Sequence, residues 1–271
     1  MFRSLALGGG GVRGGLHVGA LIALEEKLGH LSFPDGIYGS SIGSVLATAV
    51  AFGMNTTQIR DMFYGHFTLD AFLPPLRLST LADAVQRKGL FPMDMLETTL
   101  YNAFASQGVD LHGKTIQDAP QKLHIVASNM TTRRPVIFAG NIPVMDAIKC
   151  SSCLPFVFHP QILHNNVYLD GAILVAQIAD IVPDDCLVIQ LSSETPRIFP
   201  TDLESMSIMT YMDTLYTSMR RRSSTKTILS LQNDTIGMLH DITQKDKDNM
   251  VEQGRSQTLA FLTKRLAQEL K

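Results

Sequence analysis

The chain has 271 residues, of which 45% are hydrophobic and 18% are charged, and its formal net charge at pH 7 is −2. Apolar content at this level, without a low-complexity tract, indicates a globular protein with an ordinary core. The small net charge gives no electrostatic reason to bind nucleic acid, and a chain with no Trp and six Tyr has few rings on which bases stack. We therefore expect no nucleic-acid partner.

Three cysteines, Cys150, Cys153 and Cys186, cannot all pair within one chain. Their number favours reduced thiols and a reducing, intracellular compartment. Residues 1–7 run directly into glycines and lack the apolar stretch of a signal peptide. The uncharged segment 37–59 is long enough to span a bilayer, but its glycines favour a buried strand, turn and helix. We expect a cytoplasmic protein and leave open a transient, peripheral contact with membranes.

Short apolar runs alternate with amphipathic segments through the first two thirds of the chain. Residues 2–7 predict a buried first strand, and the helix after the next glycines is expected to end at Gly29. A second strand leads into the apolar residues 44–50, and Asn55 is a good cap for a further helix. Later elements are strands over 123–128, 136–139 and 186–191, a helix over 144–150, and a hairpin with Asn165 and Asn166 at its turn.

This alternation favours an α/β fold, a three-layer α/β/α sandwich with a central, mostly parallel sheet. The remainder, residues 200–271, reads as mostly helical and is expected to pack on the sheet domain. Because no internal repeat and no linker interrupt the chain, we expect a single domain over residues 1–271.

Two stretches allow more than one interpretation. The pattern weakens from residue 66 to residue 91, which form either a covering segment or lid over an apolar pocket or an ordinary irregular connection. Pro92 then favours a helix start, and Gly108 its end. The basic cluster at residues 220–222 either attracts anionic lipid headgroups or is a solvated helix end.

One serine lies where nucleophiles of acyl transfer are commonly found. Residues 39–43 read Gly-x-Ser-x-Gly, between a short apolar strand and an apolar helix. Gly39 and Gly43 permit a tight turn that holds Ser41 exposed above the N-terminus of the helix. Ser41 is therefore the candidate nucleophile, and it requires a base and an oxyanion site elsewhere in the chain.

The glycine-rich loop after the first strand is the candidate oxyanion site. Gly9, Gly10 and Gly11 offer backbone N–H groups unobstructed by side chains, and Arg13 adds a positive charge. The same loop, continued to Gly14, also matches the Gly-x-Gly-x-x-Gly fingerprint of dinucleotide-binding proteins. That fold needs an acidic residue at the end of the second strand to hold a ribose, whereas Asp35 comes before this strand. The oxyanion role fits better.

The residue that accepts the proton of Ser41 has two candidates. Asp170 ends an apolar strand, and Gly171 after it leaves room for a backbone or a substrate, although such an aspartate is commonly a helix cap. A Ser–Asp–His triad would need a late histidine, and His240 is the sole histidine after residue 164. His240 has no further motif around it. Both assignments remain open on the residues alone.

Three motifs in this order resemble the patatin-like phospholipases: the loop from Gly9 to Gly14, the serine turn, and the Asp-Gly-Ala that begins at Asp170. Residues 150–160 and 128–136 are similar to two further stretches of that family, so the resemblance covers about residues 3–192. It implies a Ser41–Asp170 dyad without histidine, an oxyanion site in the loop of Gly9, Gly10 and Gly11, and activity without calcium or another cofactor.

The expected function is hydrolysis of a fatty-acyl ester in a phospholipid, lysophospholipid or neutral lipid, through an acyl-serine intermediate. Arg13, Gly14, Gly39, Gly43 and Gly171 are expected to support the two catalytic groups and the oxyanion loop. Three alternatives stand beside this expectation: a triad esterase that uses His240, a lipid-binding or scaffold protein without activity, and an NAD-binding protein.

Overall fold

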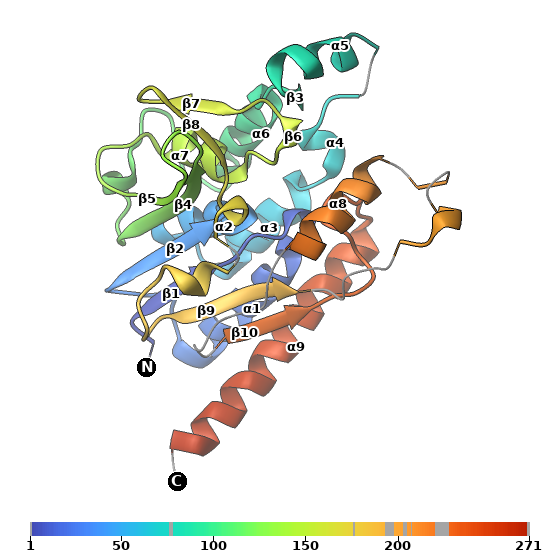
Figure 1. Cartoon of the computed structure of the whole chain (residues 1–271). Coiled ribbons are helices and arrows are strands. Elements are labelled where there is room, and N and C mark those ends of the chain that lie inside the picture. Colours follow the sequence, from blue (N-terminus) through green and yellow to red (C-terminus); the bar gives the residue numbers. More distant parts are fainter. Residues whose placement is uncertain are drawn as a thin grey trace.

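The computed structural model of the chain describes residues 2–75, 78–175, 177–192, 198–202, 205–206, 208–219 and 228–269 (Figure 1). Within these residues, eight strands form one sheet in the order β10-β9-β1-β2-β4-β8-β7, with β5 paired to β4 beside this path. The strands are β1 (Ser4–Leu7), β2 (Gly36–Ser40), β4 (Leu123–Asn129), β5 (Arg134–Phe138), β7 (Gln161–Leu163), β8 (Asn166–Asp170), β9 (Leu187–Ser192) and β10 (Ile228–Gln232). Two further strands, β3 (Gly89–Phe91) and β6 (Phe156–Phe158), form a separate parallel pair.

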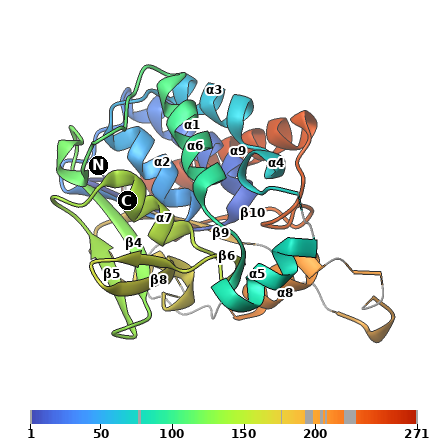
Figure 2. The ribbon, with the colours of Figure 1, turned by 90° about the horizontal axis from the view of Figure 1, so that it is seen from above.

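The sheet is mostly parallel. Strands β10, β9, β1, β2 and β4 run in one direction, whereas β5 and β8 are antiparallel to β4, and β7 is antiparallel to β8. Helices flank the sheet (Figures 1 and 2). The predicted α/β fold with a central, mostly parallel sheet is therefore confirmed. The basic cluster that the sequence shows at residues 220–222 lies outside the described residues.

The helices connect the strands and cover them. They are α1 (Gly14–Leu28), α2 (Ile42–Ala51), α3 (Thr56–His66), α4 (Leu69–Phe72), α5 (Leu78–Arg87), α6 (Asp94–Ala105), α7 (Val144–Ser152), α8 (Ile208–Met219) and α9 (Gln244–Glu269). Short 3-10 turns are η1 (Gly11–Arg13), η2 (Ile116–Asp118), η3 (Gly171–Ile173), η4 (Ile178–Asp180) and η5 (Pro200–Asp202). Gly29 ends α1 with a φ of 80°, and Asn55 caps α3, as predicted.

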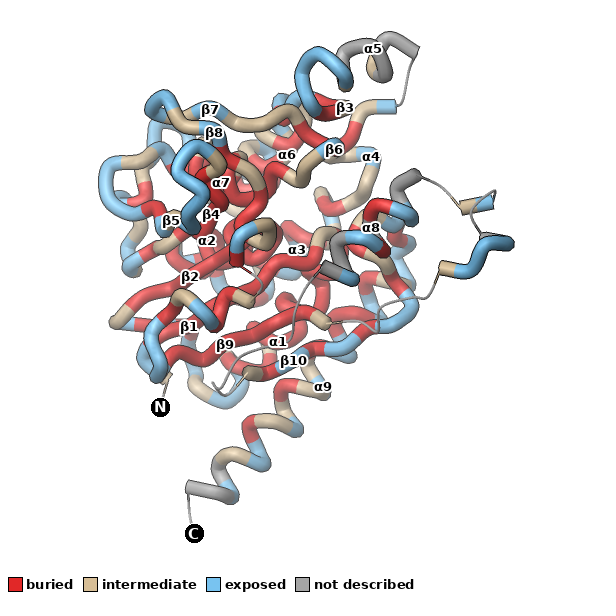
Figure 3. The backbone as a smooth tube through the Cα atoms, viewed as in Figure 1, coloured by how far each residue is buried: buried red, intermediate tan, exposed pale blue. Residues whose placement is uncertain are grey.

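The core is split between the two faces of the sheet. Leu5 and Leu7 of β1 belong to the large core beneath the helices, whereas Ala6 between them belongs to a smaller cluster on the opposite face. This alternation follows from the two-residue period of a strand. The smaller cluster contains Ile178 and Ala179 of η4, so a short turn rather than a long helix covers this part of the sheet. Figure 3 shows the buried central strands.

The long helix α9 packs against α1 at the edge of the molecule (Figure 1). A side chain at Gly19 of α1 would overlap the carbonyl oxygen of Val251, and one at Gly254 of α9 would overlap that of Leu16. Glycine on each helix thus allows the two backbones to approach closely. The expectation of a single domain over residues 1–271 stays a prediction.

Three local predictions differ from the structure. Strand β10 was not predicted within the region that reads as helical, yet Leu229 and Leu231 are buried and alternate with exposed residues. The tight turn between β7 and β8 consists of His164 and Asn165, with φ values of 46° and 61°, one residue earlier than predicted. Helix α6 begins at Asp94, two residues after Pro92.

The described cysteines are free thiols, and all three are buried. Burial raises the pKa of Cys150 to about 12 and raises that of Cys153 further. Among the described residues, no helix combines the length and the apolar character needed to cross a bilayer.

Candidate active site

Ser41 occupies a strained position between β2 and α2. Its φ of 55° and ψ of −129° lie outside the conformations that most residues adopt, and such strain persists where the surrounding structure enforces it. A side chain at Gly39 would overlap the backbone of Gly43 and Ser44. One at Gly43 would overlap the carbonyl groups of Leu7 and Gly8. The turn therefore requires glycine on both sides of the serine.

Two further serines hold this turn in place. The backbone N–H of Ser41 donates to Oγ of Ser151 at 2.9 Å, and the Ser151 hydroxyl donates to the carbonyl oxygen of Val126 at 2.6 Å. The Ser44 hydroxyl donates to the carbonyl oxygen of Ser41 at 2.6 Å. The backbone of Ser41 is thus bonded on both sides. The sequence motif did not identify Ser151, since it belongs to α7 and lies 110 residues away.

The pairing of β4 brings Asp170 to the serine turn. Along β4, Val126 pairs with Ser40 of β2, and the next residue, Ala127, pairs with Asp170 of β8. Because β5 occupies the other edge of β4 at both positions, β2 and β8 share one edge. The end of β8 therefore meets the end of β2, where Ser41 begins the turn into α2.

Asp170 is 1% exposed and its carboxylate is held by the start of η3. Its Oδ1 accepts a hydrogen bond from the backbone N–H of Ala172 at 2.9 Å. Its own N–H donates to the carbonyl oxygen of Cys153 at 2.8 Å. A side chain at Gly171 would overlap Oγ of Ser40, so glycine there allows β8 to reach the serine turn.

The glycine-rich loop joins β1 to α1 and lies against the serine turn. The carbonyl oxygen of Gly8 accepts from Nε2 of His17 at 2.8 Å, and that of Gly10 accepts from the backbone N–H of Arg13 at 3.3 Å. In a trans peptide the C=O and the following N–H point in opposite directions. The N–H groups of Gly9 and Gly11 are therefore directed away from His17 and Arg13.

Close packing also requires glycine in this loop. Gly11 has a φ of 58°, and a side chain there would overlap the carbonyl oxygen of Met238. A side chain at Gly10 would come within 2.5 Å of Leu191, and one at Gly14 within 2.6 Å of Ile42. The loop is thus confined between β9, the segment around residue 238, and α2.

His17 is a buried residue of the site that the sequence motifs did not identify. Burial lowers its pKa to about 4, so the imidazole is neutral at neutral pH and carries its proton on Nε2, where the Gly8 carbonyl accepts it. Nδ1 has no hydrogen-bond partner within the described part of the chain, so a second proton would be buried without an acceptor. His17 keeps the first peptide of the glycine loop in one orientation.

Arg13 places a permanent positive charge beneath the glycine loop. Its side chain is 2% exposed, and Nε donates to the carbonyl oxygen of Gly10 at 3.4 Å. A buried guanidinium contributes a positive potential in a region of low dielectric, where such a charge acts strongly. This potential favours negative charge on a group bound at the loop.

An apolar pocket of about 90 Å³ opens beside Ser41. Its residues come from both ends of the chain and include part of the segment 66–91, whose first residues line one wall. They are Gly11, Val12, Ser41, Ile42, Val45, Phe67, Leu69, Phe72, Leu73, Leu96, Leu100, Ser152, Leu154, Phe158, Met238 and Leu239. Almost all are apolar, so the pocket favours a hydrocarbon group next to the serine hydroxyl.

Two residues named in alternative interpretations lie apart from this arrangement. His240 is exposed and is not among the pocket residues, although Met238 and Leu239 before it are. Asp35 lies before β2, at the opposite end of that strand from the glycine loop, and forms a two-bond ion pair with Arg3. Asp35 is therefore not positioned to hold a ribose at the loop.

Comparison with known sequences agrees with the motifs. The family model described as patatin-like phospholipase matches residues 5–179. The chain is 29% identical over 142 residues to the cUMP-AMP-activated phospholipase of Escherichia coli, covering 52% of this chain and 38% of that protein. It is 26% identical over 182 residues to a probable lipid hydrolase of Invertebrate iridescent virus 6, covering 64% and 60%. The chain thus spans less than two thirds of the length of these curated relatives.

Solved structures share the fold. VipD from Legionella pneumophila superposes with a TM-score of 0.56 at 15% identity, over 97% of this chain and 67% of that one. The type III effector ExoU, known from Pseudomonas aeruginosa, superposes with a TM-score of 0.53 at 17% identity, over 97% and 53%. At these identities the likeness concerns the fold alone.

Proposed function

The chain belongs to the patatin-like phospholipase family, and from this premise we propose that it is a lipid acyl hydrolase that uses a Ser41–Asp170 dyad. The observation that carries this proposal is the pairing of β4, where Ser40 and Asp170 occupy consecutive positions of one strand edge. The apolar pocket beside Ser41 supports an acyl chain as the group that is bound.

In the proposed reaction, Oγ of Ser41 attacks the acyl carbonyl carbon while the carboxylate of Asp170 accepts the hydroxyl proton. The bond between the carbonyl carbon and the alcohol oxygen then breaks, and the proton passes to the departing alcohol. This step leaves an acyl-Ser41 ester. Water then attacks that ester with Asp170 again as the base. This step releases the fatty acid and regenerates the free serine.

The negative charge that develops on the carbonyl oxygen needs donors. Backbone N–H groups of Gly9, Gly10 and Gly11 are the proposed donors, and the buried charge of Arg13 adds to the potential at this loop. Donors fixed in advance stabilise such a charge without reorganising during the reaction. The bonds from His17 and Arg13 to the loop carbonyls support this role, because they fix the peptide planes.

An aspartate is an unusual base for a serine. In water its pKa is near 3.9, so it removes a proton only when geometry favours the transfer. Asp170 is almost fully buried and its backbone is bonded to Cys153, which supports a fixed position in a site with little water. His240 is exposed and is not among the described residues that line the pocket, so its position does not support a triad.

The proposed substrates are phospholipids, lysophospholipids or neutral lipids, cleaved without calcium or another cofactor. Several relatives carry the name phospholipase or lipid hydrolase, which supports this class of substrate. Such substrates reside in membranes, so the proposal includes transient contact with a membrane surface.

The test compares three variants in hydrolysis of p-nitrophenyl butyrate, a soluble ester. Ser41→Ala and Asp170→Asn are each expected to lower kcat/KM by roughly a thousandfold or more, whereas His240→Ala is expected to retain wild-type activity. Full activity in Ser41→Ala or Asp170→Asn contradicts the dyad. If the wild type neither hydrolyses the ester nor reacts with a fluorophosphonate at Ser41, the result favours the alternative of a lipid-binding or scaffold protein without activity.

A further inference from the structure

A small exposed surface lies on the helix and strand pair that projects beyond the main sheet. Helix α5 extends away from the other helices and packs mainly against the β3 strand that follows it (Figure 1). Strand β3 pairs in parallel with β6, and Gly89 lies opposite Phe156. This pairing brings Phe156 beside the C-terminal end of α5. We call Val85, Arg87, Lys88 and Phe156 the α5–β6 surface.

Two large apolar side chains on this surface are open to solvent. Val85 is 75% exposed and Phe156 is 69% exposed. Removing a large apolar side chain from water is favourable, so each of these side chains can contribute to the binding of a partner that covers it. The exposed C-terminal end of α5 lies in the upper part of Figure 3.

The backbone at this surface is strained at Phe156 and at Lys88, the residue before the Gly89 that pairs with Phe156. Lys88 has a φ of 63° and Phe156 a φ of 64°, both in the left-handed region that residues other than glycine seldom adopt. Strain of this kind persists only where the surrounding structure enforces it. Phe156 also lies between Leu154 and Phe158, which both line the pocket beside Ser41. Strand β6 therefore links the outer surface to the catalytic pocket.

The charge on this surface is positive. Arg87 and Lys88 are both exposed, and neither has an ion-pair partner within the part of the chain that the structure describes. Nζ of Lys88 donates to the carbonyl oxygen of Val85 at 2.8 Å, so this cation lies at the last turn of α5. The surface thus combines two apolar side chains with two adjacent cations.

We propose that the α5–β6 surface docks onto a bilayer that contains anionic phospholipids. Val85 and Phe156 enter the interfacial region, while Arg87 and Lys88 contact the phosphate and carboxylate groups of the headgroups. The positive charge selects an anionic bilayer over a zwitterionic one, and β6 carries the pocket entrance toward the membrane. The inference rests on the proposed function, since a lipid hydrolase must reach substrates held in a bilayer.

The test measures co-sedimentation with vesicles, in the Ser41→Ala background so that no lipid is consumed. Vesicles consist of phosphatidylcholine with or without one third phosphatidylserine. The double variant Arg87→Gln/Lys88→Gln is expected to weaken binding to the anionic vesicles about 30-fold, at roughly 1 kcal/mol for each cation. Phe156→Ser is expected to weaken it about 10-fold. The Ser41→Ala protein without further substitutions is the reference protein. Its binding to the anionic vesicles is expected to decrease as the salt concentration rises.

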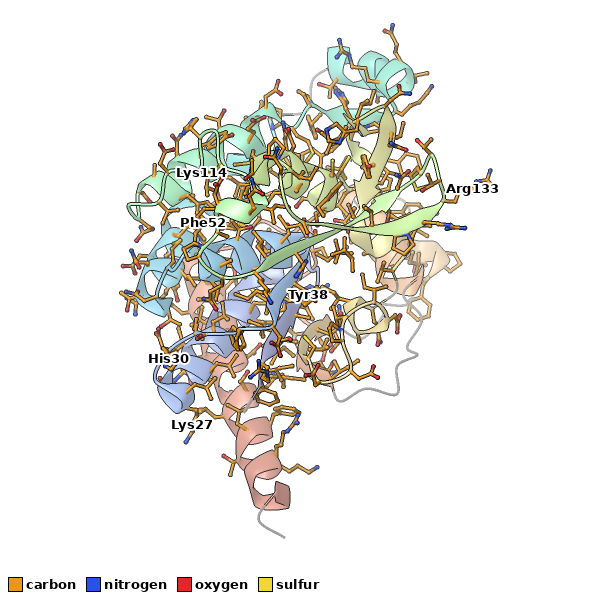
Figure 4. The ribbon with its side chains drawn as sticks, turned by 90° about the vertical axis from the view of Figure 1, so that its left-hand side faces the viewer. Lys27, His30, Tyr38, Phe52, Lys114 and Arg133 are labelled. Atoms are coloured by element: carbon orange, nitrogen blue, oxygen red, sulfur yellow. The ribbon has the colours of Figure 1, made fainter. Side chains whose placement is uncertain are left out.

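Two matched controls lie elsewhere on the surface. Arg133→Gln/Arg134→Gln removes the same charge from the tip of the β4–β5 hairpin, where the labelled Arg133 extends into solvent (Figure 4). Ile162→Ser removes an apolar side chain from β7, and this side chain, at 76% exposure, is comparably open to solvent. Both controls are expected to bind as the reference protein does. Hydrolysis of p-nitrophenyl butyrate by each variant, with Ser41 restored, is expected to stay at the wild-type level.

Several outcomes overturn the inference. One is that the Arg87→Gln/Lys88→Gln variant binds the anionic vesicles as tightly as the reference protein. The inference fails equally if the Arg133→Gln/Arg134→Gln control loses as much binding as the Arg87→Gln/Lys88→Gln variant. Another is that replacement of residues 220–222 by glutamine abolishes vesicle binding, whereas replacement of Arg87 and Lys88 leaves binding unchanged. A third is a monomer–dimer equilibrium in analytical ultracentrifugation that Phe156→Ser abolishes, which assigns the surface to a second copy of the chain. Ester hydrolysis is measured separately, so failure of the proposed function is recognised independently.

Discussion

Ser41 lies between two parts of the site that differ in how they are built: a catalytic wall, formed by the tight turns around the serine, and an apolar wall, formed by the side chains of the pocket. On the catalytic wall, Gly39, Gly43 and Gly171 each stand where a side chain would overlap neighbouring atoms. The apolar wall consists of side chains such as Phe67, Phe72 and Leu239, which present hydrocarbon surfaces to the pocket. Geometry on the first wall is fixed by the backbone, whereas shape on the second is set by side-chain volume. Substitutions should therefore abolish activity on one wall and change preference on the other.

The largest expected effect comes from Gly43→Ala. The added methyl group would overlap the carbonyl oxygen of Leu7, so the variant should lose roughly 1–3 kcal/mol or more of unfolding free energy and most of its ester hydrolysis. Gly65→Ala is the matched control, because nothing lies within 4 Å of the new group in α3 and helix propensity favours alanine by up to about 1 kcal/mol. Urea denaturation of both variants checks this, and equal stability of the two would refute the close packing.

The next effect concerns His17 and pH. Its pKa is about 4 in the folded protein, below the ordinary value of 6.5, so the unfolded chain binds the proton more readily. The stabilisation that this difference provides is complete above pH 6.5 and is lost as pH falls toward 4. At about 1.4 kcal/mol per pKa unit, the loss amounts to about 3 kcal/mol.

Replacing this residue isolates its contribution. His17→Gln retains an amide N–H that can donate to the Gly8 carbonyl, and its unfolding free energy should fall about 3 kcal/mol less between pH 6.5 and 4 than that of the wild type. His30→Gln, at an exposed position, serves as the control and should follow the wild type. If the unfolding free energy of His17→Gln depends on pH as that of the wild type does, protonation of His17 does not destabilise the folded protein and the prediction is wrong.

The smallest effect is expected on the apolar wall. Phe72 packs edge-on against Phe67, with ring centroids 5.1 Å apart, and lines the pocket. Phe72→Ala should lengthen the pocket and raise the ratio of kcat/KM for p-nitrophenyl decanoate over butyrate about 3- to 10-fold, since each buried methylene contributes about 0.8 kcal/mol. Ile162→Ala, away from the pocket, is the control. A ratio that stays constant in Phe72→Ala would place the acyl chain elsewhere.

The contrast between the walls also explains what the sequence could predict. Glycines and the serine turn form short motifs because the tight turns that they allow are local, even where the atoms that they approach are distant in the sequence. The α/β fold was predicted for the same reason, from strands and helices with clear periodicity. The roles of Ser41 and Asp170 stay predictions, although the structure brings the serine turn and the end of β8 to one edge of β4.

Features that depend on distant contacts could not be predicted in this way. Ser151 bonds to Ser41 across 110 residues, and no motif marks a serine in a helix as an anchor. His17 is visible in the sequence as a histidine on an apolar helix, but its bond to Gly8 requires the loop to fold back. Strand β10 joins the sheet beside β9 because Leu229 and Leu231 are buried there, although the sequence of this region reads as mostly helical.

The central claim is that Ser41 carries the acyl group and that Asp170 takes its proton. Intact-protein and peptide mass spectrometry after rapid acid quenching of a reaction with p-nitrophenyl butyrate tests this most directly. The account predicts one butyryl group on the peptide that contains Ser41 in the wild type and in His240→Ala, and none in Asp170→Asn. Turnover by the wild type with the acyl group on another residue, or undiminished acylation of Asp170→Asn, would contradict it.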